Sequence, residues 1–295
     1  MKSNRLHIFS ASALLVLLAL GGCSESNELA PETDGNEIMT FNVQHPSQQQ
    51  ESVTRVTDTA FENGDRIGLF ITGKDTPLEQ SGNYVNNAPL SYSGNQWSTD
   101  KPIYWNNGTY NVYAYYPYTT PVTSVENFPF SVQLNQEGTG HAQSDFLWAG
   151  KTGVSATGNP IALQFRHRMS RLVIKLVKGE DYEGDLPEEA EVYLHSTVPD
   201  ATVDFAAGVV TRNPYASAQT IRAKSIGGHK YSAIVVPQRL DNRQPLVEVI
   251  MKGVSYLYES KFLFKPGIQH SVQLAISKNP EQIKIEIGGE IENWE

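Results

Sequence analysis

Short stretches in which apolar and polar residues alternate limit the fold of this chain more than any other feature. In 110–116, Tyr110, Val112, Ala114 and Tyr116 lie at every second position, and 270–276 repeats the pattern with Val272, Leu274 and Ile276. A period of two places these side chains on one face of a strand. Gly, Pro and Asn turns separate the stretches, and the chain holds 23 Gly and 16 Pro. The sequence therefore predicts an all-β protein.

The same alternation predicts strands in many other stretches, namely 37–43, 67–71, 127–134, 161–177, 190–195, 201–206, 231–236, 246–251, 256–264 and 282–287. No stretch combines a helix cap with a period of 3.6, and 213–222 is the best place for a short helix. Within 161–177 the alternation gives way to residues that are apolar on both faces, which indicates a bend or passage from one sheet environment to another. Strands at this spacing indicate β-sandwiches, and two that meet near 160–175 are favoured over one large sandwich.

The N-terminus has the layout of a secretory signal. Lys2 and Arg5 precede an apolar run that ends at Leu20, and Gly21-Gly22-Cys23 follows. The run is shorter than the roughly 20 apolar residues that span a bilayer. Cys23 is the only cysteine, and its place resembles that of the lipidated cysteine in bacterial lipoproteins. We expect residues 1–22 to be removed, Cys23 to carry diacylglycerol and palmitate, and 23–36 to be a disordered tether. The alternative is an ordinary signal peptide with an accidental cysteine.

The charge of the mature chain argues against nucleic-acid binding. Without residues 1–22 the chain carries 21 basic and 32 acidic residues, a net charge of -11. Phosphate recognition requires clustered Lys and Arg, so we expect no nucleic acid as a partner. A lipidated Cys23 leaves no cysteine for a disulfide, so the core must stabilise the exported fold.

No residue pattern indicates an enzyme, a metal site or a cofactor. The mature chain has scattered histidines without HExxH spacing, namely His45, His141, His167, His195, His229 and His270. His167 is expected to be partly buried and hydrogen-bonded to the backbone. Several carboxylates are expected to be solvated in turns rather than to form a glycosidase pair, namely Asp145, Asp181, Glu183, Glu188 and Glu189. The tyrosines that could form a ligand-contact surface are instead assigned to core and ordinary sheet surface, namely Tyr113, Tyr115, Tyr116 and Tyr118.

Several segments together resemble the fimbrillin family of Bacteroidetes. Besides the cysteine motif they are Thr54-Arg55, 59–70 (TAFENGDRIGLF), 103–105 (IYW), 113–117 (YAYYP), 145–149 (DFLWA), 165–172 (FRHRMSRL) and 291–294 (IENW). The likeness implies two tandem transthyretin-like Greek-key β-sandwich domains, placed here at 37–168 and 169–295. It implies a structural subunit of surface fimbriae, or pili, for cell adhesion, located in the cell outer membrane through its lipid and in the fimbrium. Asp58-Thr59-Ala60 also resembles an O-glycosylation signal used by Bacteroides.

The family resemblance also implies an assembly route. An arginine- or lysine-specific protease would cut between Arg55 and Val56, the strand 37–43 would leave, and a neighbour's strand would replace it. Arg55 is the first basic residue after Cys23. The alternative is that Arg55 is a plain loop residue and the strand stays. Residues 282–287 (QIKIEI) are a candidate donor strand, although they are favoured slightly as an edge strand of their own domain.

The partners that follow from this resemblance are other fimbrial subunits in a homo- or hetero-polymer, an arginine-specific protease and a host glycan or protein ligand. The competing hypothesis is a monomeric surface-exposed lipoprotein that binds a glycan or a protein. A strand 37–43 lying between other strands would make exchange feasible.

Overall fold

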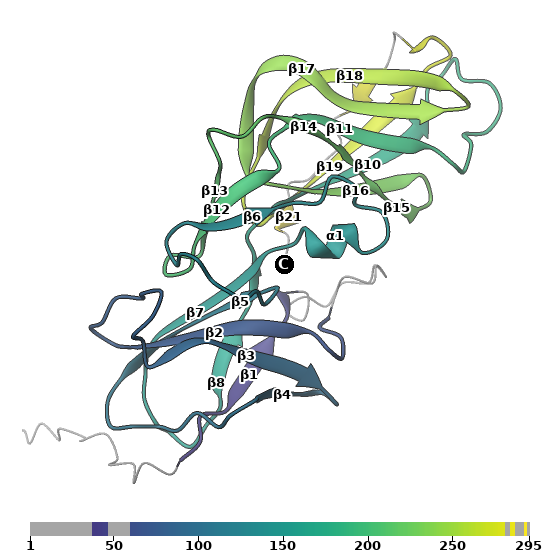
Figure 1. Ribbon diagram of the computed structural model, residues 1–295. Helices are drawn as coiled ribbons and strands as arrows, with labels where there is room; N and C mark the ends of the chain where they lie inside the picture. Colours follow the sequence, from purple (N-terminus) through teal and green to yellow (C-terminus); the bar gives the residue numbers. More distant parts are fainter. Residues whose placement is uncertain (1–36, 47–59, 281–283, 287–291, 294–295) are drawn as a thin grey trace, which may run out of the picture. The chain divides into compact units, whose positions relative to one another are not determined.

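The computed structural model describes residues 37–46, 60–280, 284–286 and 292–293, and they belong to one compact unit. The described chain is built from strands β1 to β21 with one short helix, α1 (Gly140–Gln143), as Figure 1 shows. The predicted all-β fold is confirmed. Residues 213–222 do not form the expected helix: a turn leads into β14 (Gln219–Arg222), whose Ile221 is buried against its sheet neighbours.

A six-stranded antiparallel sheet lies in the N-terminal half of the described chain. Its order is β4-β3-β2-β5-β7-β9. Its strands are β2 (Arg66–Gly73), β3 (Val85–Ser93), β4 (Gln96–Thr99), β5 (Tyr110–Tyr116), β7 (Leu147–Val154) and β9 (Arg166–His167). We call it the N-sheet below.

Both faces of the N-sheet are buried at its centre. On β2, Ile67 and Ile71 belong to one apolar cluster, which we call the first, whereas Phe70 belongs to another, which we call the second. Gly68 lies between them, and a Cβ at this position would overlap the Tyr115 ring. Glycine is therefore required here so that the ring of the neighbouring strand can cross β2.

Three further sheets contain most of the remaining strands. One has the order β15-β16-β10-β19-β20 with β21 also on β19, the second is β14-β11-β17-β18, and the third is β13-β12-β6. The strands are β6 (Phe128–Ser131), β10 (Ser170–Lys178), β11 (Glu191–Thr197), β12 (Asp200–Asp204), β13 (Val209–Arg212), β15 (Lys224–Gly227), β16 (Lys230–Val235), β17 (Gln238–Met251), β18 (Val254–Phe264), β19 (Ile268–Ile276), β20 (Lys284–Glu286) and β21 (Glu292–Asn293). β10 and β19 run parallel, and the other pairs in these sheets are antiparallel.

The stretch 161–177 changes sheets, as its sequence predicts. β8 (Ile161–Gln164) pairs with β1 (Phe41–Gln44), β9 joins the N-sheet, and β10 lies at the centre of the sheet formed by β15, β16, β19 and β20. Leu172 and Ile174 on β10 are buried in the second apolar cluster. The pattern of burial along the chain thus changes where the strand changes its neighbours.

The second apolar cluster joins the two halves of the sequence. It contains most core residues after 168 and also Phe70, Tyr115 and Phe146. Tyr115 is therefore buried at 1% exposure, and its assignment to ordinary sheet surface was wrong because the N-sheet has no solvent face there. The described sheets are consistent with two tandem sandwiches, and the boundary at 168/169 stays a prediction.

Candidate functional site

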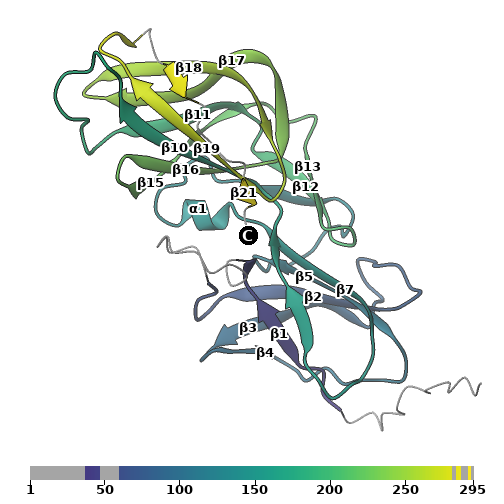
Figure 2. The same cartoon turned by 180° about the vertical axis from the view of Figure 1, so that it is seen from behind.

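The short strand β1 forms a sheet of two with β8. The two strands run parallel, and their register pairs Phe41 with Ile161 and Gln44 with Gln164. Ile161 donates its backbone N–H to the carbonyl of Thr40 at 2.8 Å, and Phe165 donates to that of Gln44 at 3.0 Å. Figure 2 shows β1 and β8 side by side, as does Figure 1. One edge of β1 is therefore closed by backbone hydrogen bonds to β8.

The residues that precede β1 bond to a different segment. The N–H of Met39 donates to the carbonyl of Ile103 at 2.7 Å, and the N–H of Trp105 donates to that of Glu37 at 2.7 Å. Ile38 and Tyr104 form an antiparallel bridge between these bonds. Residues 37–44 therefore occupy a slot between the 103–105 segment and β8. We call this slot the strand groove.

Alternate side chains of the groove segment are buried in the first apolar cluster. Met39 is 4% exposed and Val43 is 9% exposed, whereas Thr40 faces solvent. Complete burial of a Val or Met side chain contributes about 1.5–3 kcal/mol. Phe41, at the alternate position between them, is partly buried against the same cluster. A strand with apolar residues at these three positions and the same backbone bonds could make equivalent contacts.

The C-terminal end of the groove segment lies at a small cavity of about 160 Å³ that both polar and apolar side chains line. His45 is buried there, with its ring edge-on to Phe61 at 5.0 Å and to His167 at 6.0 Å. His167 Nδ1 lies 2.8 Å from Asp145 Oδ2. His167 is therefore buried as predicted, but it pairs with a carboxylate rather than only with backbone. Asp145 was expected to be solvated and is instead half-buried because of this pair.

Tyr116 and Asp65 also line this cavity. The hydroxyl of Tyr116 donates to Asp65 Oδ1 at 3.2 Å, and burial followed by the Asp65 charge raises the pKa of Tyr116 far above its usual value. Asp65 Oδ2 also accepts the N–H of Glu62 at 2.7 Å. Tyr116 therefore stays protonated and fixes the turn before β2, close to where the chain emerges from residues 47–59.

The three residues predicted from sequence to carry function lie outside the described residues. They are Cys23, Arg55 and Val56. The structure does describe both flanks of 47–59, where His45 and Phe61 are buried and in contact.

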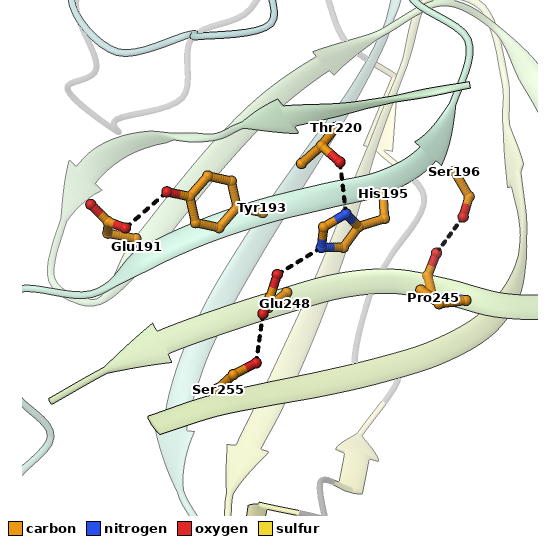
Figure 3. Close-up of polar contacts among 8 residues, drawn as sticks. All are labelled: Glu191, Tyr193, His195, Ser196, Thr220, Pro245, Glu248 and Ser255. Carbon is orange, nitrogen blue, oxygen red and sulfur yellow. Dashed lines mark hydrogen bonds and ion pairs between the residues drawn. The ribbon is translucent and has the colours of Figure 1, made fainter. Parts of the chain in front are cut away.

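A polar network that no sequence pattern indicates lies on the four-stranded sheet β14-β11-β17-β18. His195 Nδ1 lies 2.9 Å from Thr220 Oγ1, and His195 Nε2 lies 2.9 Å from Glu248 Oε2. Ser255 donates its hydroxyl to Glu248 Oε1 at 2.6 Å, and this bond, followed by the bond from His195, lowers the pKa of Glu248. Figure 3 shows His195 between Thr220 and Glu248.

This network has the order hydroxyl, imidazole, carboxylate that nucleophilic enzymes use, but its carboxylate also accepts a hydrogen bond from a second hydroxyl group. Ser255 occupies the second oxygen of Glu248, and the four residues come from four neighbouring strands. Next to His195, Ser196 has a φ of 62° at a bulge in β11 and donates its hydroxyl to the carbonyl of Pro245 at 2.8 Å. The contacts therefore cross-link β14, β11, β17 and β18. Among the described residues, no group of three or more His, Cys, Asp or Glu could hold a metal ion.

Comparison with known proteins assigns the family. The model of the fimbrillin-like family matches residues 54–294. The chain belongs to the fimbrillin-like family. A comparison with curated proteins found no match.

Solved structures share the fold of this fimbrillin-like chain. The crystal structure of a proposed cell adhesion protein from Bacteroides ovatus has a TM-score of 0.68 at 22% identity, covering 87% of this chain and 96% of that one. One from Bacteroides uniformis has a TM-score of 0.64 at 19% identity, covering 81% and 94%. The tip fimbrial protein Mfa3 from Porphyromonas gingivalis, with a C-terminal truncation, has a TM-score of 0.50 at 7% identity, covering 79% and 95%.

The C-terminal segment of the fimbrillin-like chain pairs within its own sheet. β20 runs antiparallel to β19, with Lys284 opposite Ala275 and Glu286 opposite Gln273. In the described part of the chain β20 is the last strand on that side of the sheet. This agrees with the favoured interpretation of 282–287 as an edge strand. In the described ranges, no helix is long and apolar enough to cross a bilayer.

Proposed function

We propose that this protein is a structural subunit of surface fimbriae for cell adhesion and that it polymerises by replacement of residues 37–44. Membership of the fimbrillin-like family supports this function. Structures of the same fold include a tip fimbrial protein and proposed cell adhesion proteins. Its partners are then other fimbrial subunits, identical or different.

The strand groove carries the proposal. The segment 37–44 is attached by backbone bonds to β8 and to 103–105 and buries two alternate side chains, Met39 and Val43. Its removal would leave two unpaired strand edges and an open apolar slot. Such edges bind an added strand readily, since backbone bonds supply affinity and alternate side chains set register.

The groove also restricts the strand that can replace the segment. A replacement in the same register runs parallel to β8 and antiparallel to 103–105, with apolar residues at the places of Met39 and Val43. The segment 282–287 carries Ile283, Ile285 and Ile287 at alternate positions and so has a suitable pattern. A donor from another copy would give a homopolymer, and a donor from a different subunit would give a heteropolymer.

Removal of the segment requires a cut in the chain behind it. We place the cut between Arg55 and Val56, by an arginine-specific protease at the cell surface. Arg55 is the first basic residue after Cys23, and the stretch 47–59 joins two buried anchors, His45 and Phe61. Lipid on Cys23 would hold the uncut subunit in the outer membrane, and the cut would release the subunit from its lipid.

Treatment of the mature chain with an arginine-specific protease tests this proposal. We expect a new N-terminus at Val56 and a ladder of oligomers on a non-boiled gel. Arg55→Gln should abolish both. Arg243→Gln is the matched control, because Arg243 is an exposed arginine within β17, and its loss should leave cleavage and ladders unchanged. A chain that is cut at Arg55 and stays monomeric would contradict polymerisation by this route.

Lipidation has a separate test. Metabolic labelling with a palmitate analogue should mark the wild-type protein and leave Cys23→Ser unlabelled, and only the wild type should fractionate with the outer membrane. Labelling of Cys23→Ser would place the lipid elsewhere.

A monomeric surface lipoprotein that binds a glycan is the second candidate function. A neutral cleft on the N-sheet, described next, favours it, and a ligand site of this kind is compatible with either candidate.

A further inference from the structure

An open cleft of about 580 Å³ lies at one end of the N-sheet, and its residue Tyr84 bonds to the 103–105 segment that borders the strand groove. β2 ends there and the neighbouring antiparallel strand β5 begins there. The lining comes from the end of β2, the loop 74–84 and the turn before β5. It consists of Thr72, Gly73, Thr76, Gly82, Asn83, Tyr84, Asn107, Gly108, Thr109 and Tyr110. The volume is within the range of pockets that hold small molecules.

The lining carries no charged side chain, although the whole chain has a net charge of -9. Its side chains are hydroxyls, amides and phenols. Anions are bound by basic side chains, and divalent cations by sites that usually include carboxylates, and this lining has neither kind of side chain. An apolar ligand prefers an apolar wall. The chemistry of the cleft fits a neutral ligand rich in hydroxyl groups.

The loop 74–84 is fixed before any ligand arrives. Asn83 Oδ1 accepts the N–H of Glu79 at 3.0 Å, and Asn83 Nδ2 donates to the carbonyl of Glu79 at 2.6 Å and to Asn86 Oδ1 at 2.8 Å. At the other end, Lys74 donates its N–H to the carbonyl of Thr109 at 2.9 Å. Because the loop is ordered by these bonds, binding would cost little conformational entropy.

Tyr84 presents an aromatic surface at the cleft. Its hydroxyl donates to the carbonyl of Tyr104 at 2.7 Å, and its ring packs on that of Tyr110 with centroids 4.9 Å apart. It is nevertheless 42% exposed, so part of the ring is free for contact. A ring held at both ends makes a rigid anchor.

The lining also contains a side-chain amide, that of Asn107. Asn107 is exposed, and no described residue hydrogen-bonds its side chain. Thr76 and Thr109 add hydroxyl groups to the same wall. Saccharides have apolar C–H faces that pack on aromatic rings and rims of hydroxyl groups that bind amides and alcohols.

We propose that this cleft is a binding site for a neutral saccharide, of mono- or disaccharide size. The apolar face of a sugar packs on Tyr84, and its hydroxyl groups bond to Asn107, Thr76 and Thr109. This site would give the fimbrial subunit a glycan ligand. It does not depend on strand exchange, because the cleft is complete in the single chain.

The test is a titration of the full mature chain, labelled with nitrogen-15, in amide-resolved NMR. The probes are D-galactose, D-mannose, D-glucose, L-fucose and N-acetyl-D-glucosamine, followed by disaccharides of these sugars. We expect saturable shifts at the amides of Asn83, Tyr84 and Asn107 with at least one probe. Shifts at no amide of the cleft with any probe, or binding of a peptide there instead, would overturn the proposal.

Variants assign the binding to the cleft. Tyr84→Ala should weaken the affinity by about tenfold or more, since truncation of a central aromatic anchor commonly costs about 2 kcal/mol. Tyr215→Ala is the matched control, because Tyr215 is a 95% exposed tyrosine elsewhere on the chain, and it should bind as the wild type does. Unchanged affinity in Tyr84→Ala would contradict the site.

A second pair of variants avoids any effect of Tyr84 on folding. Asn107→Ala removes only an exposed amide and should weaken binding, whereas Asn159→Ala, at another exposed turn, should not. Equal affinity in both would also count against the site. Sugar binding without protease-induced ladders would contradict polymerisation alone, and ladders without sugar binding would contradict only this saccharide site.

Discussion

The strand segment 37–44 and the turn between β12 and β13 cover opposite faces of the N-sheet, and they are attached by different means. The segment 37–44 contacts the cluster that contains Ile67, and its bonds to β8 and 103–105 are backbone to backbone. The turn inserts Phe205 into the cluster that contains Phe70. One element is attached mainly through its backbone and the other mainly through its side chains.

The turn is attached by an aromatic stack and an indole. Phe205 is 1% exposed and stacks on Tyr115 with centroids 4.4 Å apart. Trp148 Nε1 donates to the carbonyl of Phe205 at 2.7 Å. Trp148 lies on β7, and the Arg168 guanidinium lies 4.6 Å from the centroid of its ring. Gly208 lies so close to the same ring that an added Cβ would overlap it.

The difference explains which element another chain could replace. Backbone hydrogen bonds are the same for every sequence, so a groove that uses them accepts any strand with the correct alternation. Close packing of large rings depends on shape and tolerates little change. Under the proposed strand exchange, the N-sheet would exchange the strand on one face and keep the turn on the other face attached.

Phe205→Ala should have the largest effect on stability. Loss of a fully buried ring costs about 3–5 kcal/mol, through lost burial and the cavity that remains. Chemical denaturation of the full chain measures the loss. The second cluster contains core residues from the N-sheet and from the strands after residue 168. We therefore expect Phe205→Ala to lower the free energy of unfolding of the whole described fold. A loss below about 1 kcal/mol would mean that the side-chain attachment is not stronger than the groove.

Gly208→Ala tests the contact under the Trp148 ring. Gly208 has a φ of 62°, and an added Cβ would overlap the ring. Gly158→Ala is the matched control, since Gly158 has a φ of 72° with nothing within 4 Å of an added Cβ. The control should cost about 1–2 kcal/mol for its backbone conformation, and Gly208→Ala about 1–3 kcal/mol more. Equal losses would show that the ring yields easily.

Met39→Ala should weaken only the strand segment. Truncation of a buried Met costs about 2 kcal/mol or more, and here the loss should appear as local opening of 37–46. Hydrogen exchange at the amide of Met39, which bonds to Ile103, should become faster, while amides on β5 keep their rates. Thr40→Ala, at the exposed neighbouring position, is the control. Equal acceleration at β5 would break the comparison, since the segment would then be part of the cooperative core.

The smallest effect is expected at the exposed network around Glu248. The hydrogen bonds from Ser255 and His195 hold the pKa of Glu248 below its ordinary value of 4.5. Their stabilising contribution is therefore present above the unfolded pKa and is lost as the pH falls through the folded pKa. Glu248→Gln should flatten the acid limb of a stability-pH curve. If Glu248→Gln left the acid limb of the stability-pH curve unchanged, the loss of stability at low pH would come from other carboxylates.

The sequence predicts those parts of the fold that depend on local pattern. The alternation in 161–177 indicated a change of sheet, and β8, β9 and β10 lie in three different sheets. Prediction from alternation failed where the burial of a residue depends on which segment covers the other face of its sheet. Tyr115 looks like surface on its own strand, but rings from other segments cover it, among them Phe205, which is distant in sequence.

The candidate site was predictable in part for a similar reason. The pattern of 37–43 predicted a strand with Met39, Phe41 and Val43 on one face; Met39 and Val43 are buried, and Phe41 is partly buried against the same cluster. The partners of that strand, β8 and 103–105, could not be derived from alternation alone. The network of His195, Thr220 and Glu248 left no local signal, because its residues come from separate strands that only the sheet brings together.

Trp105 makes the strand groove visible to spectroscopy. Trp105 is 3% exposed and lies in the same cluster as Met39. Its backbone N–H donates to the carbonyl of Glu37 in the groove segment. Departure of that segment would expose the indole to water, and its fluorescence would shift to longer wavelength. Return of the emission to shorter wavelength would then mark the moment at which a new strand enters. Occupancy of the groove could thus be followed in real time without a label, with Trp105→Phe as the blank.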